Sequence, residues 1–426
     1  MTNVVNLPRR TEKRTRHELG FFIRVGHNDH RELLNLLASG EAGMFGLVIS
    51  AQHASRHAEL IADARDRGFD VILDPKTQEM GTPGAYSNGL AGLPWGGEDF
   101  HRVSDFQGEA GRGLVEQIVE FAVERQFTQL IGPTHLVSSP NDLWLRTDVA
   151  AMGWARDIIS AARVQMPLIY SLAIPIAVLR NRTLRQALLP AVADIPCDAI
   201  WLRVENFGDD ASGDKTVAYM EACRDFHAAG IPIVADHVGG LPGLAALAFG
   251  AVGGIAHGIA VHQNFHASAW RRPRKEDVGS FAPPAKRVYI RQLDALLKPE
   301  TARQLLQSSP RARGHFACND QHCCPRGMHD MLSNPGRHAI YQRAREIEQL
   351  AGMPQSVRVQ GYLDGMVRAV SDDVARAAGF ASLPDDLRQK LGKKQTQVSA
   401  FRTAVTHVSE VPSPSLAVVP KRRSTR

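Results

Sequence analysis

The chain has 426 residues, 44% of them hydrophobic and 22% charged, which is ample apolar material for a large globular core. No run of eighteen uncharged apolar residues occurs, and the N-terminus lacks the apolar centre of a secretory signal, so we expect a cytoplasmic protein without a membrane partner. The net charge of +6 comes largely from the basic runs at 9–16, 271–275 and 421–426, and such runs are often solvated segments.

Short apolar runs alternate with stretches of helical period from residue 20 to residue 266. The predicted strands are eight runs at 21–25, 46–50, 70–74, 129–133, 167–171, 199–204, 232–236 and 253–258. Seven predicted helices separate them, several ending in Gly as helix C-termini prefer. This rhythm predicts a (β/α)8 TIM barrel. The alternative, a doubly wound open sheet, would send its first strand into a GxGxxG turn, whereas this strand runs into GHNDH.

The segments outside the barrel rhythm define the expected domain organisation. A Gly-, Pro- and aromatic-rich insertion at 75–111 predicts a lid or substrate wall on the barrel rim. A basic flexible N-terminus at 1–19 precedes the barrel at 20–266. A connector and Cys/His module follow at 267–345, with a strand and a helix expected in VYIRQLDALL (288–297). We expect a helical extension at 346–393 and a disordered tail at 394–426.

Three of the five cysteines cluster in ACNDQHCCPRGMHDMLSNPGRH (317–338). Thiolate and imidazole are the ligands that tetrahedral Zn²⁺ prefers, and a Cys3His set leaves no open position, so the pattern predicts a structural zinc site. The ligands would be Cys318, Cys323, Cys324 and His338, with His329 as the alternative fourth ligand. A buried or redox-active cysteine group without metal is the competing interpretation.

Polar residues end most of the predicted strands, and the carboxyl ends of barrel strands converge on one site. We predict Asp74 and Asp236 as catalytic, because each is a carboxylate ending an apolar strand, where burial can tune its pKa. Alternatives are a structural ion pair between Arg203 and Glu205 and hydrogen-bonded wall histidines. The predicted substrate-binding residues are His53, Gln78, His135, Arg203, Glu205, His237 and His257.

A barrel followed by a Cys3His module resembles the tRNA-guanine transglycosylase superfamily, including relatives that insert 7-deazaguanine bases into DNA. VILDPKTQ (71–78) is similar to the family motif DSGGFQ, whose Asp acts in base exchange, and ISAQHA (49–54) is similar to NTYHL. The stretch 231–258 is similar in rhythm to the family's last two strands, and the resemblance spans about residues 20–345. Two departures are Ala256-His257, where the family has its nucleophilic Asp, and cysteine spacing that differs from CxCxxC.

The resemblance implies a pentosyltransferase that exchanges a purine or 7-deazapurine base in tRNA or DNA. Asp236 would attack the sugar and Asp74 would act as general base, while Gln78, His53 and His237 would read the base edge. Basic residues at 271–275 and 287–291 would hold phosphates. A homodimer is compatible with this interpretation.

Two other functions stay open at this point. A TIM-barrel enzyme for a small phosphorylated metabolite would use the glycine pairs at 239–240 and 253–254 as its phosphate site. An inactive barrel serving as a binding module is the third interpretation. A salt bridge between Asp236 and Arg203 would defeat the paired-carboxylate mechanism and favour these two.

Overall fold

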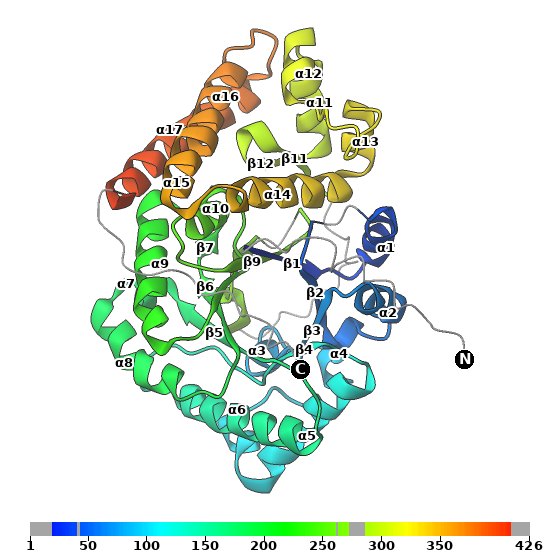
Figure 1. Cartoon of the computed structure of the whole chain (residues 1–426), viewed down its shortest axis with the longest axis vertical. Helices are drawn as coiled ribbons and strands as arrows, with labels where there is room; N and C mark the ends of the chain where they lie inside the picture. The colour runs from blue at the N-terminus through cyan, green and yellow to red at the C-terminus, as the bar shows by residue number, and fades with distance from the viewer. Residues whose placement is uncertain (1–18, 41–42, 261–262, 272–285, 410–426) are drawn as a thin grey trace.

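The computed structural model describes residues 19–40, 43–260, 263–271 and 286–409, and its centre is a closed barrel of eight parallel strands (Figure 1). The last strand pairs with the first in the register Gly20↔Gly254, and the strands otherwise follow one another in chain order, which confirms the predicted barrel. The barrel strands are β1 (Gly20–Val25), β2 (Gly46–Ser50), β3 (Asp70–Asp74), β4 (Gln129–Ile131), β5 (Leu168–Pro175), β6 (Ala199–Glu205), β8 (Ile233–Asp236) and β9 (Gly254–Gly258).

Helices cover the outside of the barrel and bury their apolar faces against it. Those between consecutive strands are α1 (His30–Ser39), α2 (Ala58–Asp66), α5 (Gly108–Glu124), α6 (Leu143–Ala161), α8 (Arg182–Ala193), α9 (Gly213–Phe226) and α10 (Gly240–Ala248). Shorter elements at the rim are α3 (Thr77–Met80), α4 (Asn88–Ala91), α7 (Ile176–Arg180), β7 (Phe207–Gly208) and β10 (Asn264–Phe265). In the described part of the chain, no helix combines the length and apolarity needed to cross a membrane.

Alternation along each strand sorts the side chains between the barrel interior and the surrounding helices. Phe22 and Trp201 face inward and help to fill the lumen, while Phe21 and Ile23 face outward into the main core. The interior apolar layer consists of Phe22, Val48, Ile72, Ile131, Ile169, Ala199, Trp201, Val234 and Ala256. The next inward position on several strands is polar, so one polar layer lies on top of this apolar layer.

The eighth helix of the barrel comes from the C-terminal module. Helix α14 (Pro335–Ala351) contacts both α10 and α1 and lies between them beside β9 and β1 (Figure 1). On α1, Glu32 accepts a hydrogen bond from the backbone N–H of Arg337. The module is therefore part of the barrel wall, although more than seventy residues separate β9 from α14 in the sequence.

The remaining C-terminal elements flank α14, and β11 and α13 contact it directly. They are β11 (Val288–Ile290), β12 (Ala295–Leu297), α11 (Pro299–Gln307), α12 (Pro310–Phe316), α13 (Met328–Ser333), α15 (Gln355–Gly361), a π-helical turn (Tyr362–Val367), α16 (Arg368–Ala378) and α17 (Asp385–Ser409). The helix expected after β11 is wrong: the chain turns at Asp294, which has a φ of 42°, and returns as the antiparallel strand β12.

The predicted disordered tail is also wrong for residues 394–409, which belong to α17. This helix packs on α9 and α16 and buries Val398, Phe401 and Val405. These three residues are spaced so that they lie on one face of a helix. The pattern is hard to recognise in the sequence because many of the residues around it are lysine and glutamine. Residues 410–426, like the N-terminal residues 1–18 and the basic run 272–275, lie outside the described part.

The insertion at 75–111 folds back on the barrel. Trp95 is fully buried, and its indole N–H donates to the carbonyl of Pro75 at 3.1 Å. The backbone N–H of Gly84 donates to the carbonyl of Trp270, which links the insertion to the segment that follows β10. The insertion is thus an ordered wall, in keeping with its predicted place on the rim.

Candidate functional site

Inward-facing polar side chains gather where the barrel strands end. The strands are parallel, so their carboxyl ends meet at one mouth. The apolar layer of the lumen lies beneath these groups and excludes water from below. The polar set is Arg24, Ser50, Asp74, Ser171, Arg203, Glu205 and Asp236, all of them buried.

Arg24 joins the two predicted catalytic carboxylates. Its Nε and Nη2 donate to the two oxygens of Asp236, each at 2.6 Å, and its Nη1 donates to Asp74 at 2.7 Å. The three side chains come from β1, β3 and β8. The structure therefore brings Asp74 and Asp236 to one place, but with a guanidinium between them.

Arg203 holds Asp236 from the other side. Its Nε donates to Asp236 Oδ2 at 2.9 Å, and its Nη1 donates to the amide oxygen of Gln78. Gln78 in turn donates to the carbonyl of Ser171 at 3.0 Å and to Thr134 Oγ1 at 3.3 Å. Gln78 and Arg203, two of the predicted site residues, are thus locked into one buried network.

The two guanidiniums set the ionisation of the carboxylates. Burial alone would raise the pKa of Asp236, but the charges of Arg24 and Arg203 outweigh it and hold that pKa well below its usual range. Burial likewise opposes ionisation of Asp74, and Lys76, Arg24 and Arg203 together lower its pKa. Both groups are ionised at neutral pH, with their oxygens occupied by N–H donors.

A carboxylate held in this way is a weak base, because proton transfer or attack would break charged hydrogen bonds. The salt bridge between Asp236 and Arg203, with Nη2 at 2.8 Å from Oδ2, is the arrangement that counts against the paired-carboxylate mechanism. The geometry therefore favours the metabolite-enzyme or binding-module interpretation over base exchange.

Backbone strain is concentrated at the mouth. Lys76, Asn206 and His237 have φ values of 66°, 63° and 60°, and they follow the ends of β3, β6 and β8. Non-glycine residues adopt this left-handed conformation at a cost of about 1–3 kcal/mol each, and such residues cluster at functional sites. The three strained residues therefore mark the loops after β3, β6 and β8 as part of the candidate site.

The network leaves several polar atoms without a partner. Among the described residues, Ser50 Oγ and His237 Nδ1 are buried and make no hydrogen bond, whereas Arg203 Nη2 is paired with Asp236 Oδ2 at 2.8 Å. Burial lowers the pKa of His237 well below its ordinary value, despite the opposing charge of Asp236, so its imidazole is neutral at pH 7. The site thus holds an unpaired hydroxyl and a neutral imidazole with an unpaired nitrogen.

His53 and His135, two predicted substrate-binding residues, lie away from this network. His53 ends the turn after β2 and packs against His27, with ring centres 4.8 Å apart; burial, with help from His27 and Lys76, lowers its pKa to about 4. His135 donates or accepts through Nδ1 at 2.7 Å from Asp148 and stacks on Trp144 at 3.8 Å. The structure therefore places His135 in the wall rather than at the mouth.

Glu205 lines a pocket of about 170 Å³ above the ends of β5 and β6. Its carboxylate binds Arg271, at 2.8 Å between Oε2 and Nη2, and not Arg203 as the sequence alternative had it. Phe265 also lines the pocket, and its ring lies 5.4 Å from the guanidinium carbon of Arg203. The pocket is therefore adjacent to the ion network.

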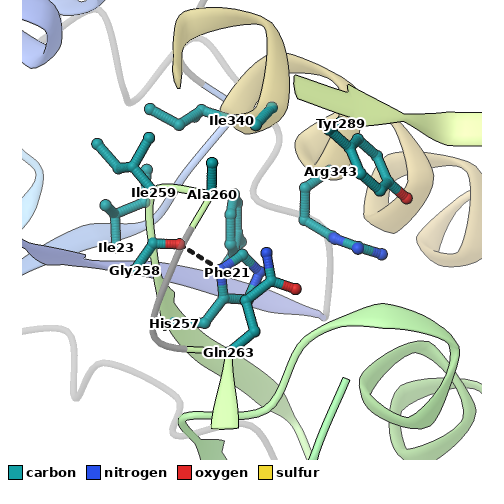
Figure 2. A pocket seen from close by; sticks show the side chains of 11 residues that line it. Phe21, Ile23, His257, Gly258, Ile259, Ala260, Gln263, Tyr289, Ile340 and Arg343 are labelled. Carbon is teal, nitrogen blue, oxygen red and sulfur yellow. Dashed lines mark hydrogen bonds between the residues drawn. The ribbon is translucent and has the colours of Figure 1, made fainter. Parts of the chain in front are cut away.

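His257 faces the opposite side of the barrel wall. Side chains alternate along β9, and His257 is at an outward-facing position next to the inward-facing Ala256. Its ring therefore lies against Phe21 and below Arg343 and Tyr289 (Figure 2). The ring lines a cavity of about 10 Å³, near the volume one water needs, and Nδ1 lies 2.9 Å from the carbonyl of Gly258. His257 is thus remote from the mouth, contrary to its predicted role in substrate binding.

The glycine pairs do not form the expected phosphate site. Gly253 and Gly254 precede β9 or begin it, at the amino ends of the strands, where Gly254 pairs with Gly20. Gly240 begins α10, but the next N–H, that of Leu241, donates to the carboxylate of Asp294 at 2.9 Å. A carboxylate of this chain therefore already occupies the anion-binding position of that helix.

The Cys3His cluster is a second site, separate from the mouth. The ligand atoms of Cys318, Cys323, Cys324 and His338 all lie within 4.8 Å of one another, and all four residues are buried. His338 Nε2 lies 2.9 Å from the carbonyl of Tyr289, which fixes this nitrogen as the donor and leaves Nδ1, 3.3 Å from Cys323 Sγ, for a metal. The group fits one metal ion, and His338 rather than His329 belongs to it.

Sequence reasoning missed Arg24, the residue that contacts both carboxylates. A signal was present, because FFIRV places this arginine two residues after Phe22, with inward parity, in an otherwise apolar strand. A charge at an inward position needs a buried partner, and that need points to the carboxylates of other strands.

No family model and no curated protein matches the chain. Solved structures with a similar fold include 3-dehydroquinate dehydratase from Enterococcus faecalis (11% identity, TM-score 0.35, 57% of this chain and 89% of that one). The YdjI aldolase from Escherichia coli K12 is similar at 11% identity and TM-score 0.36, over 81% of this chain and 95% of that one. The carboxyl transferase domain of Rhizobium etli pyruvate carboxylase is similar at 10% identity and TM-score 0.37, over 94% of this chain and 61% of that one. Similarities this distant do not bear on function.

The fold and the site together define a TIM-barrel protein with a buried polar network at its mouth and a Cys3His cluster behind its last strand. The resemblance to the tRNA-guanine transglycosylase superfamily stays a prediction.

Proposed function

We propose that the protein is a TIM-barrel enzyme that acts on a small acidic metabolite by proton transfer. The observation that carries this proposal is the pair of buried, unpartnered polar atoms at the mouth, the hydroxyl of Ser50 and Nδ1 of His237. Unused donors bind carboxylate, phosphate or carbonyl oxygens. The adjacent pocket of about 170 Å³ suits a small molecule rather than a polymer segment.

His237 is the proposed general acid–base. Burial lowers its pKa, so the ring is neutral in the free protein; a bound acid would bring a negative charge that raises this pKa and lets Nδ1 accept a proton. Asp236 and Asp74 are proposed as positioning residues, because their charges hold Arg24 and Arg203 in place. The hydroxyl of Ser50 would bind a substrate oxygen, and the charges of Arg24, Arg203 and Lys76 would stabilise negative charge as the proton leaves.

The experiment is to incubate the full chain with a small-molecule cell extract in D2O and follow the extract by mass spectrometry. We expect one acidic compound to be consumed or to gain deuterium with wild-type protein. His237→Gln should slow this about 10²- to 10⁴-fold, the usual contribution of a general base. His266→Gln, at an exposed rim histidine, should retain the wild-type rate. An extract left unchanged by the wild-type protein contradicts the proposal.

Nucleic-acid base exchange is the rival function, favoured by the convergence of Asp74 and Asp236 and by the Cys3His cluster. It is tested by incorporation of labelled guanine or a 7-deazaguanine into tRNA and duplex DNA. Incorporation that disappears in Asp236→Asn would establish the rival and displace the metabolite proposal. Binding of a small acid without turnover would instead support the binding module.

For the Cys3His cluster, the proposed occupant is structural zinc. Three thiolates and one imidazole complete a tetrahedral shell, so no position is left for a substrate. Arg337 donates to the carbonyl of Cys323 at 3.0 Å, and Gln342 donates to Cys318 Sγ at 3.5 Å, which orients the ligands. Because His338 belongs to α14, the metal would fasten the eighth barrel helix to its loop.

A further inference from the structure

Four histidines gather at the rim beyond β1 and β2, outside the ion network. His27 and His30 belong to the turn after β1 and the start of α1, and His53 and His57 to the turn after β2. Their ring centres lie 4.8 Å apart for His27 and His53, 6.0 Å for His53 and His57, and 5.4 Å for His30 and His57. The rings therefore form one continuous cluster.

The spacing of the second pair suits a shared ligand. The backbone N–H of His57 donates to the carbonyl of His53 at 3.0 Å, which is the hydrogen bond of one helical turn. Residues four apart on a helical turn project to the same side, as in the two-histidine metal motifs of helices. His53 and His57 thus lie on the same side of the turn, with their ring centres 6.0 Å apart.

The buried member of the cluster has no partner. His57 is 1% exposed, and neither of its ring nitrogens makes a hydrogen bond within the described residues. His30 Nδ1 is also buried and unpartnered. A buried polar atom without a partner costs about 1–3 kcal/mol, so these nitrogens call for a ligand that the protein itself does not supply.

The dimensions match imidazole coordination. Two imidazoles bound to one tetrahedral ion, at about 2.0 to 2.1 Å each, place their ring centres about 5 Å apart. The histidine nitrogens are less tightly grouped than the ligands of the Cys3His cluster, so binding requires rotation of the exposed His27 and the half-buried His53. Arg56 lies beside the cluster, where its Nε donates to the carbonyl of His27 at 3.0 Å and its Nη2 donates to Asn28 Oδ1.

We propose that His27, His53 and His57, with His30 as a fourth donor, form a second metal site that takes a divalent transition ion such as Zn²⁺, Co²⁺ or Ni²⁺. Neutral imidazole suits these ions, whereas Mg²⁺ and Ca²⁺ prefer oxygen ligands. The site opens toward solvent at His27, which leaves room for an oxygen ligand. It does not depend on the proposed metabolite reaction.

The test counts metal in the full chain. Protein is loaded with Zn²⁺, dialysed to equilibrium against micromolar Zn²⁺, and analysed by mass spectrometry of the metal. Wild type should hold two equivalents per chain, and His53→Gln/His57→Gln should hold one. His266→Gln should hold two. A single equivalent in wild type, or two in the double variant, overturns the proposal.

A second measurement keeps the test independent of folding. A mild chelator first removes the second zinc equivalent and leaves the Cys3His cluster filled; Co²⁺ added to this protein should give a visible ligand-field spectrum without thiolate-to-cobalt charge transfer. The single variant His53→Gln, at a half-buried position, should weaken this binding at least tenfold while its thermal unfolding stays as in wild type. A thiolate charge-transfer band would place the cobalt in the Cys3His cluster and contradict the second site.

Discussion

The Cys3His cluster and the barrel mouth are both buried polar centres, but they are assembled over very different distances along the chain. The metal ligands lie within 21 residues of one another, from Cys318 to His338. At the mouth, 212 residues separate Arg24 from Asp236. Ligands close together in the sequence can be recognised from their spacing. The partners in the network at the mouth are brought together only when the barrel closes.

The largest expected effect is loss of the metal from the cluster. Structural zinc supplies about 10–16 kcal/mol of apparent binding free energy in small domains, and much of it here would hold α14 in the barrel wall. Cys323→Ser should lose the bound metal and unfold the module at a much lower temperature. Metal analysis and thermal unfolding of the full chain measure both effects.

Cys197→Ser is the matched control, because Cys197 is a free, half-buried cysteine outside the cluster. It should keep both the metal and the melting temperature. A Cys323→Ser protein with one full equivalent of metal in the cluster would refute the assignment of its ligands.

The next effect concerns the mouth. Arg203→Met leaves Asp236 with one guanidinium instead of two, and removing a partner from a buried ion pair typically costs about 3–5 kcal/mol. Arg271→Met breaks the ion pair with Glu205, where the arginine side chain is half exposed, and should cost about 1 kcal/mol or less. Urea unfolding at pH 7 compares the two, and equal losses would mean that the buried network does not stabilise the barrel.

The same contrast between local and long-range features decides how much of the fold and of the site the sequence predicts. The strand ends, the barrel and the cysteine ligands depend on periodicity and spacing, which are local. The roles at the mouth depend on which charges meet across the lumen, and this is not a local property. The sequence therefore indicates Asp236 and Asp74 as strand-end carboxylates but does not show that Arg24 pairs with both. The outward direction of His257 is a local property, because alternation along β9 places Ala256 inside the lumen and His257 outside it.

The same long-range problem explains the missed eighth helix. Helix α14 has ordinary helical periodicity, but its place beside β1 is fixed by contacts such as Glu32 with Arg337, far apart in the chain. Likewise, the N–H groups that begin α10 look free in the sequence, and only the fold shows that Asp294 binds one of them.

The smallest expected effect lies at the seam between the two regions, where His257 of the barrel faces Arg343 of α14. Burial lowers the pKa of His257 to about 3, with the charge of Arg343 adding to the effect, whereas the unfolded chain has a histidine pKa of about 6.5. As pH falls from about 6.5 toward 3, the unfolded state therefore binds a proton that the folded state refuses. Stability should fall by about 1.4 kcal/mol per pH unit in that window from this group alone.

His257→Phe tests this coupling, because phenylalanine keeps the ring against Phe21 and cannot be protonated. At pH 7 it should cost about 1 kcal/mol for the lost hydrogen bond to Gly258. Between pH 6.5 and 4 its unfolding free energy should fall less steeply than that of wild type, while His266→Phe, at an exposed histidine, should keep the wild-type slope. If His257→Phe and wild type show the same slope, the buried imidazole is not the group that makes the seam sensitive to acid.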